Sequence, residues 1–571
     1  MGRTRKIDFS AKRLNAMAEK FYDEGNYLSA LRFTFRDIEE NGENFTALTR
    51  LCDVYENLGL NSTAIKYLFK LLDVSDEADY PDIYEGLAVN YLNMGKEAPS
   101  AFYYNSLIDA DDGISNEMKL EIAQAFAKKA KSPFKISYPP HLAEYNEELD
   151  EAARALKHGD CNKANRALEK VEKGSKQYES AREMLSLSYV LSGKIEEAKA
   201  VCEEVLQNNP DNVRIKATLA AAYLESKEYE KSKEIAVSLS RLQTDNEEEL
   251  YKIATVCCEN GLHKEAYERF VVLERKAPFD GKLLYFKGVS AYKSGLYEEA
   301  ISAFSDLCTV YPEAAVVEYF LQEMRKERES SEQGEPQGLI DINYFYQIPQ
   351  TERDSRLDFL MSIEKTSKED AVLLGAIANA TGLLRWCFDE HDGMDYDLQY
   401  VACLVANRSR QDEFLREVLL DNEVIDILKL EILKFFYERN EHRELGLVLY
   451  DVYRKVEILP IKIGRKQRKK FISAYARTAS KFVLANNEYG ELLRSSAETL
   501  YRALETFDCL DHVDNVDECA CAIYLLSDLK EWGNNIEKMA AAFDANVDRV
   551  KVLLTTVACY RQSDRDLDLL F

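Results

Sequence analysis

Apolar and small residues follow a helical period through residues 281–312, and a glycine interrupts the pattern once, as in a turn. Small residues stand at Gly288 and Ala300, where two packed helices would come closest, and Phe304 supplies an aromatic ring. Pro312 follows the second apolar run and ends it, because proline cannot continue a helix. The stretch therefore predicts two short amphipathic helices that form a hairpin.

The same pattern repeats along the chain with a constant period. Gly261 and Gly295 are 34 positions apart, and Phe270 stands 34 positions before Phe304. From residue 145 onward the turn position falls at Gly159, Gly193, Lys227, Gly261 and Gly295. The small position of the second helix is occupied by Ala164, Ala198, Ser232, Ala266 and Ala300. Lys227 and Ser232 depart from the pattern, so the third copy of this array is the least regular.

Three earlier copies occupy the N-terminal part of the chain. Gly25 and Gly59 are again 34 positions apart and Gly95 marks a third turn, but Ala101 follows that turn one residue late. Prolines and polar residues then interrupt the helical pattern twice. The predicted organisation is an N-terminal block over 1–131, a linker over 132–145, a second block over 146–327, a linker over 328–340 and a C-terminal domain over 341–571.

This spacing of glycine, alanine and aromatic residues resembles the tetratricopeptide repeat (TPR), and the resemblance covers a little over half of the chain. It implies an all-α, TPR-type α-solenoid in two blocks, in which Glu313–Lys326 forms a capping helix. The C-terminal domain shows mostly helical periodicity without the repeat. Within it, residues 445–463 alternate apolar and polar positions, which predicts a short, exposed β-hairpin on a helical domain.

Composition narrows the function. The chain has 74 basic and 101 acidic residues, a net charge of −27, which disfavours nucleic acid and anionic membranes as partners. Its 12 cysteines include no Cys-x-x-Cys pair, which argues against a disulfide framework or a metal site. Neither a signal-peptide core nor a membrane-spanning apolar run is visible, so we expect a cytoplasmic protein without a membrane partner. The usual nucleotide-binding, metalloprotease and nucleophile motifs are missing, so we expect no catalysis and no cofactor.

The TPR resemblance also implies a concave groove lined by the first helix of each unit. Carried onto this sequence, the groove positions are Leu187, Val190, Ala217, Ala221, Leu224, Tyr251, Thr255, Cys258, Tyr285, Val289 and Lys293. This mixed apolar surface with two tyrosines suits a partner's amphipathic helix or extended peptide, although any single position could instead pack against a neighbouring repeat. The clamp that some TPR proteins use for a C-terminal carboxylate is replaced here by Asn15, Glu19, Thr49, Asp53, Glu85 and Val89.

A basic run stands out in this acidic chain. Within 20 residues that include no acidic side chain lie Lys462, Arg465, Lys466, Arg468, Lys469, Lys470, Arg477 and Lys481. We interpret the run as a solvated surface or one that meets an acidic protein surface, such as the chain's own repeats. Two acidic clusters, around His391 and His512, lack the spacing of a calcium-binding loop, and we interpret them as solvated loops.

Residues 536–554 carry a last candidate motif. Ala540, Phe543, Val550 and Leu553 match the apolar positions of a helix-turn-helix, but Asp544 stands where glycine is preferred. The leading hypothesis is therefore a non-catalytic protein-interaction scaffold that binds a peptide or helix in its groove. The alternative is a nucleic-acid-associated regulator that uses this C-terminal segment.

Overall fold

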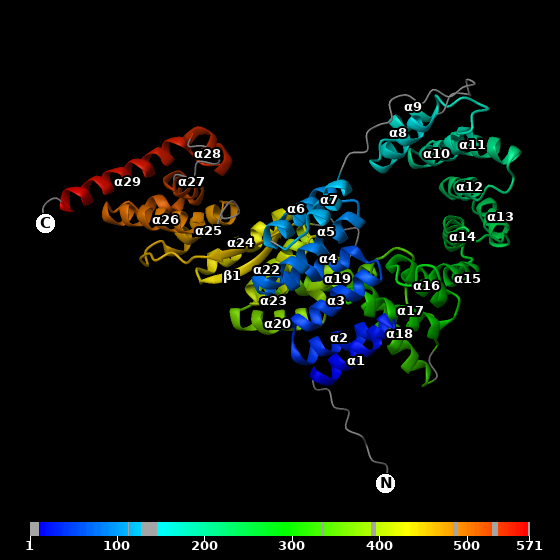
Figure 1. The fold of residues 1–571 in the computed structure, drawn as a ribbon, viewed down its shortest axis with the longest axis horizontal. Coiled ribbons are helices and arrows are strands. Elements are labelled where there is room, and N and C mark those ends of the chain that lie inside the picture. The colour runs from blue at the N-terminus through cyan, green and yellow to red at the C-terminus, as the bar shows by residue number, and fades with distance from the viewer. Residues whose placement is uncertain are drawn as a thin grey trace, which may run out of the picture. The chain divides into compact units, whose positions relative to one another are not determined.

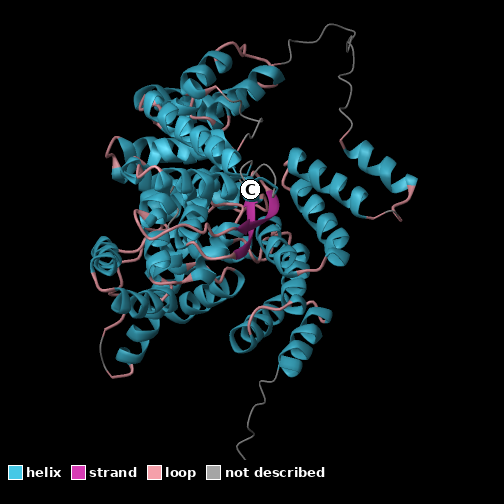
Figure 2. Ribbon diagram, turned by 90° about the vertical axis from the view of Figure 1, so that its left-hand side faces the viewer, coloured by secondary structure: helices cyan, strands magenta, loops and turns pink. Residues whose placement is uncertain are grey.

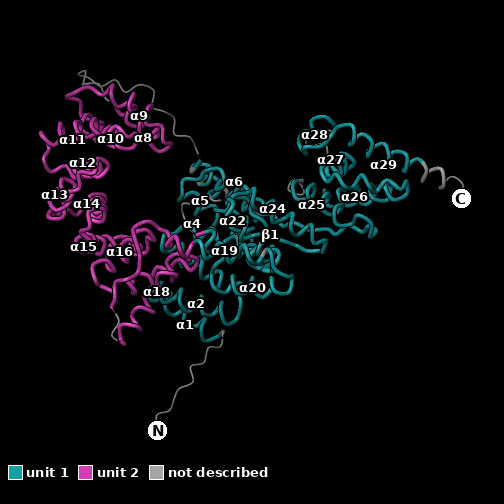
Figure 3. The backbone as a smooth tube through the Cα atoms, turned by 180° about the vertical axis from the view of Figure 1, so that it is seen from behind, with its two compact units in different colours: residues 1–127, 354–388, 392–571 teal, residues 128–353, 389–391 magenta. Residues whose placement is uncertain are grey.

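The computed structural model describes residues 11–111, 113–126, 145–333, 336–389, 396–482, 488–527 and 535–568. In these ranges the regular structure is helical except for one two-stranded sheet (Figures 1 and 2). The chain forms two compact units (Figure 3). Unit 1 comprises residues 1–127, 354–388 and 392–571, and unit 2 comprises residues 128–353 and 389–391. The predicted all-α architecture with a short β-hairpin is confirmed.

The N-terminal block, in unit 1, consists of paired helices, as the repeat predicts. The pairs are α1 (Ala11–Asp23) with α2 (Tyr27–Asn41), α3 (Phe45–Asn57) with α4 (Asn61–Val74), and α5 (Tyr80–Asn93) with α6 (Glu97–Ala110), and a 3-10 turn η1 (Glu77–Asp79) and α7 (Asn116–Ala125) complete the block. Asn26 and Asn44 cap α2 and α3, because each side-chain oxygen accepts a hydrogen bond from a free backbone N–H of the first turn.

The second block forms most of unit 2 and continues the same pairing. Its helices are α8 (Asn146–Lys157), α9 (Cys161–Leu168), α10 (Tyr178–Leu191), α11 (Ile195–Asn208), α12 (Val213–Glu225), α13 (Tyr229–Ser240), α14 (Glu247–Glu259), α15 (His263–Glu274), α16 (Gly281–Lys293), α17 (Tyr297–Val310) and the terminal α18 (Ala315–Ser331). Lys227 has φ 61° and adopts the left-handed conformation that Gly193 and Gly261 adopt at φ 73°. The irregular third copy therefore keeps its turn and its register.

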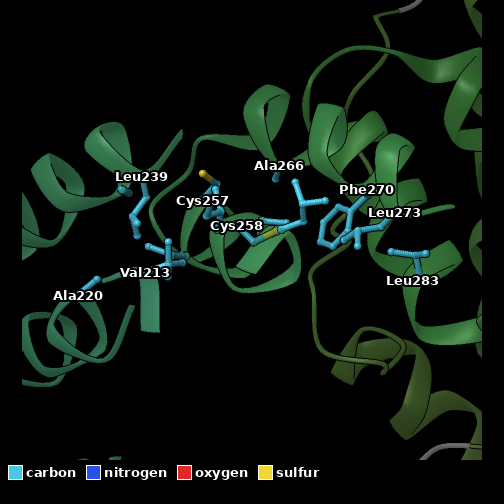
Figure 4. Packing of buried hydrophobic residues seen from close by; sticks show 14 residues of the cluster. Val213, Ala220, Leu239, Cys257, Cys258, Ala266, Phe270, Leu273 and Leu283 are labelled. Atoms are coloured by element: carbon cyan, nitrogen blue, oxygen red, sulfur yellow. The ribbon is translucent and has the colours of Figure 1, made fainter. Parts of the chain in front are cut away.

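The core of the second block lies where the paired helices meet. Ala266 and Ala300 have no exposed surface. A Cβ atom added to Gly288 would lie 2.2 Å from Cε1 of Phe304, so only glycine allows this approach of α16 and α17. Figure 4 shows the buried side chains that join α12 to α16, including Phe270 of α15. The small positions of the repeat thus set the distance between helices.

The rest of the chain adds further helices and the sheet. These elements are α19 (Gln350–Lys365), α20 (Lys368–Ala380), α21 (Leu383–Asp389), α22 (Tyr396–Arg408), α23 (Asp412–Leu420), α24 (Asp426–Arg439), β1 (Arg443–Leu449), β2 (Val452–Ile458), α25 (Arg468–Phe482), α26 (Glu488–Thr506), η2 (Leu510–Asp514), α27 (Val516–Leu526), α28 (Ile536–Phe543) and α29 (Val547–Asp568). No single helix of the described residues is long and apolar enough to cross a membrane. The α20–α21 pair, bent by 56°, meets that criterion only when the two helices are taken together.

The hairpin β1–β2 is antiparallel, with Arg443 opposite Ile458 and Leu449 opposite Val452. Tyr450 and Asp451 form its tip, and both have positive φ, 51° and 62°, as a two-residue hairpin turn requires. The expectation that this hairpin is exposed is wrong for β1, whereas Arg454, Lys455 and Glu457 of β2 are exposed. Leu445, Leu447, Val448 and Leu449 are all buried, because β1 is apolar on both faces and both faces are covered.

The first block covers part of the hairpin. The hydroxyl of Tyr91 in α5 donates to the Asp451 carboxylate at 2.9 Å, and the hydroxyl of Tyr103 in α6 donates to the Asp451 carbonyl at 2.9 Å. The Tyr103 hydroxyl also accepts from the backbone N–H of Tyr453 at 3.1 Å, and the Tyr453 hydroxyl donates to Asp73 of α4 at 2.9 Å. Helices α4, α5 and α6 therefore hold the hairpin tip through both its main chain and its side chains.

Ion pairs extend this contact between the first block and the C-terminal part of unit 1. Lys66 of α4 lies 2.8 Å from the carboxylate of Asp421, and both side chains are only 17 % exposed. Arg416 of α23 lies 3.7 Å from Asp73. A partly buried pair is screened by solvent less than a surface pair, and loss of one partner leaves an uncompensated charge. The first block and the region around α23 are thus joined in one unit.

Lys429 of α24 is a buried cation beneath the hairpin. It is 1 % exposed, and its Nζ donates to the carbonyl oxygen of Val448 at 2.7 Å. Burial lowers the pKa of Lys429 to about 8, and the nearby carboxylates of Asp421, Asp426 and Asp451 only partly oppose that shift. The folded chain therefore loses this proton at a lower pH than the unfolded chain does.

We predict that Lys429 contributes a pH dependence to the stability of unit 1. Between about pH 8 and the ordinary lysine pKa of about 10.4, the unfolded state binds one more proton, so this contribution raises stability as pH rises. Urea unfolding of wild type and Lys429→Met at pH 7.5 and pH 10 measures it. The free energy of unfolding of wild type, relative to that of Lys429→Met, should be larger at pH 10 than at pH 7.5. An unchanged difference between the two proteins would contradict the prediction.

Candidate peptide-binding surface

The residues that the TPR resemblance assigns to a groove all lie on the first helices of the pairs in unit 2. Helix α10 carries Leu187 and Val190, α12 carries Ala217, Ala221 and Leu224, α14 carries Tyr251, Thr255 and Cys258, and α16 carries Tyr285, Val289 and Lys293. Helix α8 packs against α10, α10 against α12, and α12 against α14. We call the surface formed by α8, α10, α12, α14 and α16 the first-helix face.

The part of the first-helix face on α10 and α12 is open and apolar. Leu187 is 43 % exposed, and Leu191, one helical turn further along α10, is 62 % exposed. Ala221 and Leu224 of α12 are half-buried beside them. Leu191 was not among the predicted positions, although its spacing of four residues from Leu187 places both on one side of the helix. Exposed leucines on adjacent turns form an apolar strip that water solvates poorly.

The part of the face on α14 and α16 is covered by residues 339–348, which follow α18 and which we call segment 339–348. Tyr285 is 2 % exposed and Val289 is 0 % exposed. The Tyr285 hydroxyl points at the main chain of the segment, 2.9 Å from the carbonyl oxygen of Asn343 and 3.0 Å from that of Phe345. A phenol has one proton, so it is shared between the two carbonyls.

Tyr344 is one of the side chains of the segment that pack into unit 2. Its hydroxyl oxygen lies 2.9 Å from Nδ1 of His263, and its ring meets Phe286 edge-on at 5.9 Å. It also packs against the core cluster that includes Cys258. Burial raises the pKa of Tyr344, lowers the pKa of His263 and raises the pKa of Cys258 to about 12. All three groups are therefore neutral at pH 7, and the contact is a hydrogen bond between uncharged groups.

The start of the segment is held by its backbone amides. The N–H of Leu339 donates to Glu327 at 2.7 Å, and the N–H of Ile340 donates to the hydroxyl of Tyr292 at 3.0 Å. Tyr292 in turn donates to the second carboxylate oxygen of Glu327 at 2.7 Å. Neither Tyr292 nor Glu327 was predicted as a site residue. No local signal pointed to them, since both bind a segment that follows them in the chain.

The other predicted positions flank this contact. Tyr251 stacks on Phe286 at 6.5 Å, Thr255 is half-buried, and Lys293 is exposed. The two tyrosines predicted to act together therefore lie in different environments. Tyr285 lies beneath segment 339–348, whereas Tyr251 is only partly buried, toward the open part of the face.

The basic run of residues 462–481 faces carboxylates of its own unit. Lys470 lies 2.6 Å from Asp514 and Lys466 lies 3.4 Å from Asp508. Arg477 lies 2.5 Å from Asp517. These carboxylates follow α26 rather than belonging to the repeats, so part of the positive charge is neutralised within the C-terminal region. The acidic cluster around His512 supplies two of them.

Residues 536–554 do form two helices joined by a tight turn, α28 and the start of α29. Asp544 ends α28 with φ 57°, in the left-handed conformation usual for glycine. Ala540, Phe543 and Val550 are buried, so the apolar positions of the motif pack inside the C-terminal region. Residues 390–395, which include most of the other acidic cluster, lie outside the described residues. Among those described, no group of histidine, cysteine and carboxylate side chains has the arrangement of a metal site.

A family model matches part of the second block. Residues 189–257 match the family model for the tetratricopeptide repeat. No curated protein matches the chain. Similar solved structures include MamA from AMB-1, with 21 % identity over 29 % of this chain and 96 % of that one and a TM-score of 0.23. YrrB, titled a TPR protein with an unusual peptide-binding site, has 15 % identity over 30 % of this chain and 87 % of that one, with a TM-score of 0.23. A TPR protein from Parabacteroides merdae has 17 % identity over 51 % of this chain and 98 % of that one, with a TM-score of 0.26.

The chain is therefore an all-α repeat protein of the solenoid class. Residues 189–257 match the tetratricopeptide repeat, and helix pairs in the same register continue through residues 145–312.

Proposed function

We propose that the chain is a non-catalytic scaffold that binds a peptide or helix of a partner protein on the first-helix face of its second block. The observation that carries the proposal is the open apolar strip of Leu187 and Leu191, 43 % and 62 % exposed. This strip lies on the same layer of helices that already holds segment 339–348 beside Tyr285. Stacked repeats use such extended faces for binding, and burying the strip supplies the driving force.

A peptide library displayed on phage and panned on the full chain tests this function. We predict that selected peptides bind with micromolar affinity in fluorescence anisotropy. The double variant Leu187→Asp/Leu191→Asp should lower the affinity for these peptides at least tenfold, about 1.4 kcal/mol. The reason is that a bound peptide would have to bury the new charges or leave the strip uncovered. The matched control is Tyr229→Asp, an apolar residue 60 % exposed at the start of α13, a second helix of its pair. Equal affinity for the double variant and the control would contradict the proposal.

A further inference from the structure

We propose that segment 339–348 is a ligand that the chain carries for its own groove, and that this site binds in its place a non-helical peptide of a partner protein with the same alternation of aliphatic and tyrosine side chains. This deepens the proposed function and rests on it. It assigns a second subsite on the first-helix face, formed by α14, α15 and α16, with a chemistry of its own.

Recognition at this subsite begins with the main chain. The Tyr285 hydroxyl donates to the carbonyl oxygens of Asn343 and Phe345, two residues apart in the segment, at 2.9 Å and 3.0 Å. At the other end, Glu327 and Tyr292 accept from the N–H groups of Leu339 and Ile340. Groups that contact only backbone atoms accept any extended chain of the right shape. The ligand must therefore present its main chain as this segment does, in a non-helical conformation with bends at residues 340 and 344–346.

Side chains add specificity with a period of two. Ile342 is 1 % exposed and Tyr344 is partly buried, whereas Asn343 between them is exposed and Phe345 is 77 % exposed. These exposures, rather than a regular strand, show which side chains face unit 2. The subsite therefore requires an aliphatic side chain followed two positions later by a tyrosine whose hydroxyl reaches His263. Phenylalanine would fill the same space but leave the buried polar groups of this pocket without a partner.

Competition follows from how the segment is connected. It belongs to no helix of the repeats, and it lies between α18, which ends at Ser331, and α19, which begins at Gln350. A short tether gives a bound segment an effective concentration in the millimolar range. A free peptide therefore has to compete with the segment and binds weakly to the intact chain. Weakening the segment's own side chains, without touching the pocket, should expose the subsite.

The test uses a fluorescein-labelled synthetic peptide of residues 337–349, QGLIDINYFYQIP, and full-length proteins in fluorescence anisotropy. Tyr344→Ala in the chain removes the buried ring and leaves the pocket residues intact. Phe345→Ala is the matched control, because it removes an exposed ring from the same segment. We expect Tyr344→Ala to bind the peptide at least tenfold more tightly than wild type or Phe345→Ala. A peptide with alanine at the position of Tyr344 should not bind.

Thermal unfolding of each variant shows whether unit 2 remains folded. If Tyr344→Ala unfolds, Tyr344→Phe replaces it, since this variant keeps the ring and loses only the hydrogen bond to His263, and it should still bind more tightly than wild type. Equal weak binding by all folded variants, or equal binding of the peptide that lacks the tyrosine, would overturn the proposal. Leu187→Asp/Leu191→Asp, introduced into Tyr344→Ala, should leave this binding unchanged, so that failure at the open strip is distinguishable from failure at this subsite.

Discussion

Replacing Gly288 with leucine should destabilise unit 2 by about 3 kcal/mol, because it forces a side chain into the closest contact between α16 and α17. The first added atom alone would lie 2.2 Å from Cε1 and 2.4 Å from Cδ1 of Phe304. The Phe304 ring cannot move aside, because it is 0 % exposed and stacks on Tyr285 at 5.7 Å with an angle of 6° between the rings. Relief requires separation of the two helices.

Differential scanning calorimetry measures this effect. For a unit of this size, 3 kcal/mol corresponds to a fall in Tm of roughly 6–12 °C. The matched control is Ala200→Leu, which adds the same side chain at an exposed position of α11 in the same unit. Its Tm should stay within about 2 °C of wild type. If Gly288→Leu melted with the control, the helices would not meet at this glycine and the repeat register would be wrong.

Replacing Gly446 with valine should separate the hairpin from the first block. A Cβ atom at this position of β1 would lie 2.0 Å from Oδ1 of Asp73 and 3.0 Å from Cδ2 of Leu420. The valine would displace Asp73, which accepts from the Tyr453 hydroxyl and faces Arg416. Overpacking and the loss of these buried partners together should cost about 3 kcal/mol.

Hydrogen exchange in α4 and α6 reports this separation directly. A loss of about 3 kcal/mol corresponds to amide exchange roughly a hundredfold faster wherever opening of this contact limits exchange. Glu444→Val is the matched control, since it places the same side chain two residues earlier on the same side of β1, at an exposed position. Unchanged protection of α4 and α6 in Gly446→Val would show that the hairpin does not hold the block.

The repeats were predictable from sequence because their determinants are local. A glycine at the turn and a small residue on the second helix recur at fixed spacing, followed in the last two copies by Phe270 and Phe304, and Lys227 shows that the turn survives where its usual residue does not. The burial of β1 could have been predicted from its continuous apolar run, but the alternation of apolar and polar residues assigned to 445–463 led to the opposite expectation. Leu445, Leu447, Val448 and Leu449 are apolar on both faces of the strand, which is typical of a strand covered on both sides.

Segment 339–348 shows what local patterns cannot reveal. Its residues carry no helical period and follow a polar stretch, so the sequence predicts a linker ending at residue 340 beside them. Its place on α14 and α16 depends on residues about 50 to 90 positions earlier, such as Cys258 and Tyr292. The alternation of Ile340, Ile342, Tyr344 and Tyr346 was visible, and it indicates an extended chain with one buried side, but it does not indicate which surface covers that side.

The packing of the first block against the hairpin also determines when this block can complete its folding during synthesis. Helix α6 ends at Ala110 and β1 begins at Arg443, so 332 residues lie between the last helix pair of the block and the strand that packs on it. At a translation rate of about 5–20 residues per second, Tyr103 and Asp73 wait roughly 20–70 s on the ribosome before the hairpin exists. During this interval the helix pairs can form from local contacts while one face of α4 and α6 stays bare, open to chaperones and to premature association. The first block is therefore synthesised first, but its contact with the hairpin forms only late in synthesis.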